Sequence, residues 1–137
     1  MLCVVNIKWL DVFETGIPFI DDDHKHLVRI IGDIEQAHTA GDIGGCRSAV
    51  GLFLDEAKAH FHREEKYLQV IGYCGLNGHA RQHRSLIDMV VRLLEDLQPD
   101  PKTGKEPDLD EKLIEDALYV LLEDVIRADA EFKTIDL

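Results

Sequence analysis

The stretch VGLFLDEAKAHFHREEKYLQVI, residues 50–71, decides the fold class because its apolar residues recur at alternating steps of three and four. Such steps place side chains on one face of an α-helix, and an apolar face of this kind packs against other helices. Two polar residues one turn apart, His60 and Glu64, interrupt the face. Its members are Val50, Phe53, Ala57, His60, Glu64, Tyr67 and Ile71.

The following stretch, residues 76–97, repeats this pattern with two histidines as the only polar members of its apolar face. That face consists of Leu76, His79, His83, Leu86, Val90, Leu93 and Leu97. Two further stretches have apolar faces at helical spacing, and each carries a polar residue that can bind a metal. The face of the first of these stretches consists of His24, Leu27 or Val28, Ile31 and Ile34. The face of the last consists of Ile114, Leu118, Leu121, Val125, Ala128 and Phe132, with Asp129 beside them.

Breaker residues separate four predicted helices. The first should begin near Asp21–Asp23 and end near Thr39, and the second should run from after Gly44-Gly45 to about Gly72. The third is predicted for residues 76–98 and the fourth for residues 109–132, after a loop with three prolines. No segment reads as a strand, and short connections imply antiparallel neighbours. The sequence therefore predicts an all-α protein, an antiparallel up-down-up-down four-helix bundle at 21–132 with an N-terminal arm at 1–20, in a single domain spanning 1–137.

Composition narrows the class of protein. The chain has 137 residues, with 15 basic and 27 acidic side chains, for a formal charge of −12. Such an acidic surface repels phosphate backbones and anionic lipid, which argues against nucleic acid and membrane partners. No stretch has the length of a transmembrane helix or the pattern of a secretory signal, so we expect a cytoplasmic protein. Cys3, Cys46 and Cys74 form no CxxC pair and are expected to be reduced thiols.

The polar residues on the apolar faces predict a metal site. A single histidine on such a face is usually a core residue with a hydrogen-bond partner, but here four helices each send metal-competent groups inward. Burying an unpaired carboxylate costs several kcal/mol, and a bound cation removes that cost. Four histidines and at least two carboxylates exceed what one tetrahedral zinc takes, and mixed imidazole and carboxylate ligands suit iron or manganese. The absence of an HExxH motif argues against a zinc protease. Two metal ions that share bridging carboxylates fit the count.

Across nearly its whole length, the sequence resembles the bacteriohemerythrins of the hemerythrin-like family. The similarity lies in an N-terminal signature, a motif in each of the second and third helices, and the end of the fourth. The residues that carry it are Trp9, Gly16-Ile17, Ile20-Asp21, His24-Lys25 and Leu27; His60-Phe61 and Glu64-Glu65; Tyr73, His79 and His83; and Leu121-Leu122, Asp129 and Phe132.

The resemblance implies a role for each of these polar residues. His24 and His60 would bind the iron that keeps an open position for dioxygen, and His79 and His83 would bind the second iron. Glu64 and Asp129 would bridge the two non-haem irons beside a bridging oxide or hydroxide. In this family two ferrous ions reversibly pass two electrons to bound dioxygen. Apolar neighbours exclude water, and the candidates, each of which is also an ordinary core position, are Leu27, Ile31, Phe61 and Leu86.

One position departs from the family pattern. The family has a fifth histidine five residues before the bridging aspartate, where this sequence has Asp124. Three interpretations remain open: Asp124 binds the iron and favours its ferric state, water or a vacancy replaces the missing ligand, or Asp124 pairs only with Arg127 and the second iron binds weakly.

Three classes of function follow. The first is a protein that binds dioxygen or a similar small ligand for storage, delivery or sensing, and a sensor would need a protein partner. The second is an enzyme: a di-iron oxidase, a peroxidase-like enzyme or one that handles nitric oxide. The third is a metal-binding module without oxygen chemistry.

The remaining histidines and three acidic residues are predicted to lie at the surface or at a helix start: His26, His38, His62, Asp22, Asp23 and Glu65.

Overall fold

Four helices account for most of the computed structural model, which describes residues 15–107 and 111–130 but not the side chains of residues 111, 113 and 124–130. They are α1 (Pro18–Thr39), α2 (Ile43–Val70), α3 (Leu76–Asp96) and α4 (Glu111–Ala130). Within the described ranges the chain forms no strand, which confirms the predicted all-α class.

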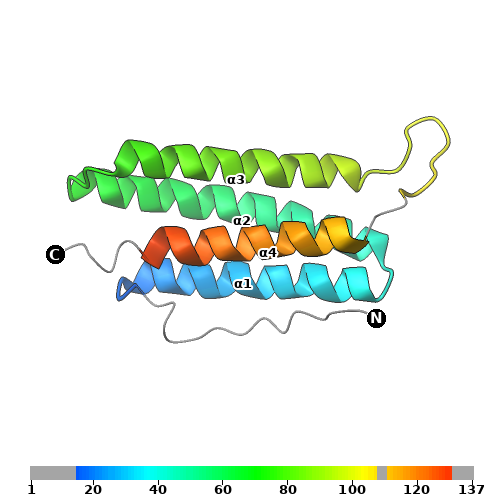
Figure 1. Ribbon diagram of the computed structural model, residues 1–137, viewed down its shortest axis with the longest axis horizontal. Coiled ribbons are helices and arrows are strands. Elements are labelled where there is room, and N and C mark those ends of the chain that lie inside the picture. The colour runs from blue at the N-terminus through cyan, green and yellow to red at the C-terminus, as the bar shows by residue number, and fades with distance from the viewer. Residues whose placement is uncertain (1–14, 108–110, 131–137) are drawn as a thin grey trace.

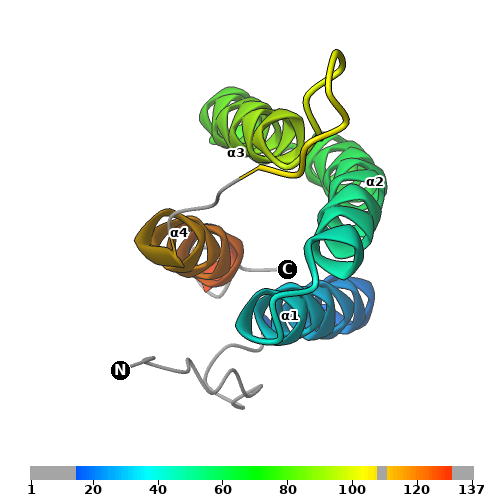
Figure 2. The same cartoon turned by 90° about the vertical axis from the view of Figure 1, so that its right-hand side faces the viewer.

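The helices run alternately in opposite directions along one long axis (Figure 1). The end-on view in Figure 2 shows α1 beside α2, α2 beside α3, and α4 between α3 and α1. The most extensive packing is between α1 and α2, followed by α2 and α3. The predicted antiparallel up-down-up-down four-helix bundle is confirmed. Because α1 and α3 begin where α2 and α4 end, residues near those termini meet at one end of the bundle.

Two helix starts differ from the prediction. Helix α1 begins at Pro18, three residues before the predicted start and within the segment assigned to the arm. Proline is favoured at the first helical position because its missing N–H would have had no partner there. Helix α2 begins at Ile43, before Gly44-Gly45, because the Asp42 side chain accepts a hydrogen bond of 2.9 Å from the Gly45 N–H.

The Asp21 carboxylate fastens the start of α1 to the residues that precede it. It accepts hydrogen bonds from the Thr15 N–H at 2.7 Å, the Thr15 hydroxyl at 2.8 Å and the Gly16 N–H at 3.1 Å. Gly16 has a φ of +85°, a conformation that favours glycine. This turn brings Ile17 and Ile20 into the end of the bundle, where both are buried.

The core has two apolar parts. A small cluster at one end contains Ile17, Ile20 and Leu68. The main cluster fills the rest of the bundle and contains Leu27, Phe53, Leu86 and Leu121 among others. Along α1, α2 and α3, the buried polar residues predicted from the sequence fall between the two clusters, so apolar side chains lie on both sides of a polar layer.

Candidate metal centre

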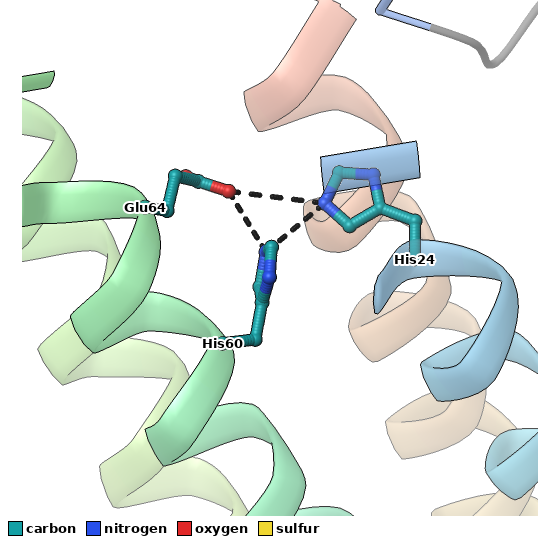
Figure 3. A group of neighbouring side chains, drawn as sticks. All are labelled: His24, His60 and Glu64. Atoms are coloured by element: carbon teal, nitrogen blue, oxygen red, sulfur yellow. Dashed lines mark hydrogen bonds and ion pairs between the residues drawn. The ribbon is translucent and has the colours of Figure 1, made fainter. Parts of the chain in front are cut away.

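Three of the predicted ligands meet between α1 and α2. His24 reaches in from α1, while His60 and Glu64 project from successive turns of α2 (Figure 3). The Nε2 atoms of His24 and His60 lie 3.1 Å apart, and Glu64 Oε2 lies 2.8 Å from His60 Nε2 and 3.9 Å from His24 Nε2. The three side chains are at most 1% exposed. Each therefore offers one ligand atom to the same small buried space.

The other oxygen of Glu64 meets the two histidines of α3. His79 Nε2 is in close contact with Glu64 Oε1, and His83 Nε2 lies 3.2 Å from the same oxygen. His79 and His83 are one turn apart, so both rings reach the same side of the carboxylate. The structure thus holds two groups of three ligand atoms, each group spanning no more than 4.8 Å, and Glu64 belongs to both.

The electrostatics of this layer suit a cation. Burial raises the pKa of the Glu64 carboxyl, but the imidazoles of His60, His79 and His83 close to its two oxygens outweigh burial and hold the pKa well below its usual range. Burial, with a smaller contribution from His60, lowers the pKa of His24 to about 3. The site therefore combines an ionised carboxylate with a neutral imidazole, which are the protonation states that metal binding requires.

Two buried atoms show that the side chains do not satisfy one another. Glu64 Oε2 and His83 Nε2 lie near histidine nitrogen and glutamate oxygen respectively, yet neither has a partner with the alignment of a hydrogen bond. An unsatisfied buried polar atom costs roughly 1–3 kcal/mol. A metal ion would use both lone pairs, so the residues fit the metal that the sequence predicts.

Two carboxylates that the sequence analysis assigned to the surface or to a helix start contact the outer nitrogens of the histidines. His60 Nδ1 lies 2.9 Å from Asp23 Oδ2, and His83 Nδ1 lies 3.0 Å from Glu65 Oε2. Asp23 and Glu65 are both partly exposed, at 22% and 34%, and the sequence analysis did not predict their contacts with His60 and His83. The missed signal was that a ligating histidine needs an acceptor for its second nitrogen, and an acidic residue directly adjoins a predicted ligand in each case.

The remaining predicted residues fall into three sets. The side chains of Asp124 and Asp129 lie outside the described part of the structure, so their predicted roles stay predictions. Asp22 and His62 are exposed and His26 and His38 are partly exposed, as expected for surface residues. The candidate water-excluding residues are all buried in the main apolar cluster: Leu27, Ile31, Phe61 and Leu86. The ring of Phe61 stacks on that of His83, with the ring centroids 3.8 Å apart.

Comparison with known families agrees with this geometry. A family model described as the hemerythrin HHE cation binding domain matches residues 15–128. The chain belongs to the hemerythrin family. That match covers all five histidine and glutamate side chains of the polar layer, and it makes the protein a member of a family of metal-binding domains.

Sequence identity to individual members of the family is low. The chain is 25% identical over 103 residues to a bacteriohemerythrin of Pseudomonas aeruginosa (strain LESB58), which covers 75% of this chain and 67% of that protein. It is 30% identical over 89 residues to a bacteriohemerythrin of Stenotrophomonas maltophilia, covering 62% and 56% of the two chains. A bacteriohemerythrin of Clostridium acetobutylicum is 31% identical over 86 residues, covering 60% of this chain and 67% of the relative. In addition, no helix in the described ranges has the length and apolar character needed to cross a membrane.

Proposed function

We propose that the chain holds two non-haem iron ions in the polar layer and binds dioxygen reversibly there. The observation that carries the proposal is the position of Glu64, whose two oxygens face two separate pairs of histidines. A carboxylate in that position can bridge two cations, and two-metal sites have such bridges with the metals about 3.5–4 Å apart. The three relatives described above are all bacteriohemerythrins, which supports the same proposal.

Each described side chain has a distinct part in this proposal. His24 and His60 would hold the iron with the open position, His79 and His83 the other iron, and Glu64 would bridge the pair. Asp129 would supply the second bridge beside an oxide or hydroxide. When bound, the irons would supply two electrons to dioxygen and take them back on its release.

The apolar surroundings support reversibility. Leu27, Ile31 and Phe61 are at most 6% exposed and belong to the main cluster, and the ring of Phe61 packs against His60 and His83. Side chains packed in this way exclude bulk water and strengthen electrostatic interactions inside the site. Water and protons would promote loss of the bound ligand in its reduced form. Side chains that exclude water therefore favour its release as unchanged dioxygen.

A second candidate function is a di-iron oxidase, and Asp124 is the residue that favours it. A carboxylate in place of the family's histidine makes the ligand set more anionic, which stabilises ferric iron. The Asp124→His variant separates the two functions. If Asp124 binds iron, the variant should oxidise more slowly in air than the native protein, whereas an Asp124 that binds no iron predicts a smaller change.

The deciding experiment is metal analysis of the purified protein, followed by absorption spectra of the anaerobically reduced protein before and after dioxygen. A carrier or sensor predicts iron in both groups, with visible bands that appear with dioxygen and disappear when it is removed. Bands that decay within seconds to the ferric state would favour the oxidase. One metal per chain, or zinc without a spectral response, would contradict dioxygen binding.

A further inference from the structure

A pocket of about 290 Å³ lies between α2 and α3, open to solvent and directly beside the metal centre. It is distinct from the space enclosed by the ligand atoms, because its lining includes exposed residues on the outer side of both helices. Helix α2 contributes Lys58, Phe61 and Glu65, and α3 contributes His83, Arg84 and Asp88. Its volume is close to the lower limit for small-molecule sites in proteins, roughly 300 Å³.

The imidazole of His83 connects this pocket to the centre. Its Nε2 atom lies 3.2 Å from the bridging carboxylate of Glu64, and its Nδ1 atom lies 3.0 Å from Glu65, which also lines the pocket. Phe61 stacks on the ring almost in parallel, with an angle of 9° between the planes. One imidazole ring therefore separates a molecule in the pocket from an ion bound at His83 Nε2.

The charges at the pocket differ from those of the whole chain. Lys58 and Arg84 are exposed and make no ion pair with any residue that the structure describes. The lining has two carboxylates, Glu65 and Asp88, and the first of these is turned toward His83. The lining of the pocket therefore has as many lysine and arginine side chains as carboxylates, whereas the whole chain has 15 basic and 27 acidic residues. Lysine and arginine together are suited to bind a phosphate or another anionic group.

The apolar part of the lining is suited to a ring. Phe61 and Ile87 both line the pocket, and Phe61 is nearly buried beneath its surface. Aromatic and aliphatic side chains that are at least half-buried in a pocket, together with exposed cations in the same lining, fit a planar molecule that carries an anionic substituent.

We propose that this pocket docks a planar, anionic heteroaromatic reductant and that electrons pass from it through His83 to the metal centre. The proposal rests on the iron centre proposed above, since a ferric form must be reduced before it can bind dioxygen again. Reduced flavin nucleotides belong to this chemical class. Their anionic dihydro form would lose two electrons and one proton to become oxidised flavin, the proton would go to solvent, and two ferric ions would be reduced to ferrous ions. No bond to a protein atom forms or breaks.

The probe is flavin mononucleotide, used with the iron-loaded protein in its ferric state. Oxidised flavin reports docking without electron transfer, through quenching of its fluorescence. Photoreduced flavin, mixed anaerobically in a stopped-flow instrument, reports the rate of iron reduction. The test variant is Lys58→Gln/Arg84→Gln. The control, Arg29→Gln/Lys102→Gln, removes the same charge at exposed positions that do not line the pocket.

The expected result is that the test variant binds oxidised flavin about tenfold more weakly and is reduced by the flavin about tenfold more slowly, while the control matches the native protein. Added salt should slow the native reaction and have less effect on the test variant. Reduction by the cationic methyl viologen radical, which gains nothing from Lys58 or Arg84, should be equally fast or faster in the variant.

Three outcomes would overturn the proposal. Flavin fluorescence that the native protein leaves unchanged would show that the pocket does not dock this class of molecule. Equal losses in the test and control variants would assign the effect to overall charge. Weakened docking with an unchanged reduction rate would place electron entry elsewhere. Failure of the proposed dioxygen function is visible separately, because neither flavin measurement involves dioxygen and the metal analysis precedes both.

Discussion

His60 on α2 donates its Nδ1 proton to Asp23 on α1 across 2.9 Å, and the same carboxylate oxygen accepts a hydrogen bond of 2.8 Å from Arg63. His60 therefore turns its other nitrogen, Nε2, toward the polar layer, where it lies 2.8 Å from Glu64 Oε2. Hydrogen bonding with His60 and Arg63 outweighs burial and lowers the pKa of Asp23, so this acceptor is ionised. The bond joins two helices and selects the tautomer of a proposed ligand in one contact.

The first prediction concerns this contact. Asp23→Ala should weaken metal binding by about 10–100-fold, because the His60 ring loses the acceptor that fixes its tautomer and orientation. Titration of the metal-free protein with ferrous iron under anaerobic conditions measures the effect. Asp22→Ala, at the exposed neighbouring position, is the matched control and should bind iron like the native protein. Equal affinities for the two variants would mean that Asp23 does not position His60.

The second prediction concerns the shared carboxylate. Glu64→Gln replaces an anion that faces four histidines with a neutral amide, so both groups of ligands lose their common member. We expect the metal content of the purified variant to fall to half of the native value or less. Glu56→Gln, which alters a partly exposed carboxylate 3.7 Å from His26, provides the control. A Glu64→Gln protein with full metal content would contradict the proposed bridge.

The third prediction concerns the start of α2. The Asp42 carboxylate accepts a hydrogen bond from the Gly45 N–H and satisfies one of the free donors at the helix start. Asp42→Ala should lower the free energy of unfolding by about 1 kcal/mol, as removal of such caps usually does. Urea denaturation followed by circular dichroism measures the loss. Asp55→Ala, at an exposed position in the interior of the same helix, should change stability much less.

The fourth prediction concerns pH and Cys46, which is 1% exposed. Burial, together with the charge of Asp42, raises the pKa of its thiol. A raised pKa in the folded state means that stability is fully present below the pKa of the unfolded thiol, about 8.5, and is lost as pH rises toward the folded value. The native protein should therefore lose stability above this pH, and Cys46→Ala should lose less.

Thiol labelling gives an independent check on the same residue. At pH 8 the exposed Cys74 should react quickly with a disulfide reagent, while Cys46 should react only on unfolding. A Cys3→Ser/Cys74→Ser variant removes the other two thiols of the chain and isolates Cys46. Rapid labelling of Cys46 in the folded variant would show that α2 opens at its first turns under native conditions.

Periodicity correctly predicted which polar side chains of α2 and α3 face the interior of the bundle. The spacing of His60 and Glu64 among apolar residues identified them as inward-facing, and both are at most 1% exposed. His79 and His83 were identified in the same way and are also buried. This works because the α-helix is a local structure: 3.6 residues per turn determine which side chains share a face, whatever the helix packs against.

The sequence by itself thus determined the helical class, the inward faces and the candidate ligands, because these depend on local geometry and on burial of apolar surface. The tertiary structure alone decided that Asp23 meets His60 and that Glu65 meets His83, contacts between residues 37 and 18 positions apart. It also decided that the oxygens of Glu64 face two pairs of histidines, and that a pocket opens over His83. Such contacts depend on how each helix is rotated and shifted against its neighbour, and side chains from the whole bundle set that arrangement together.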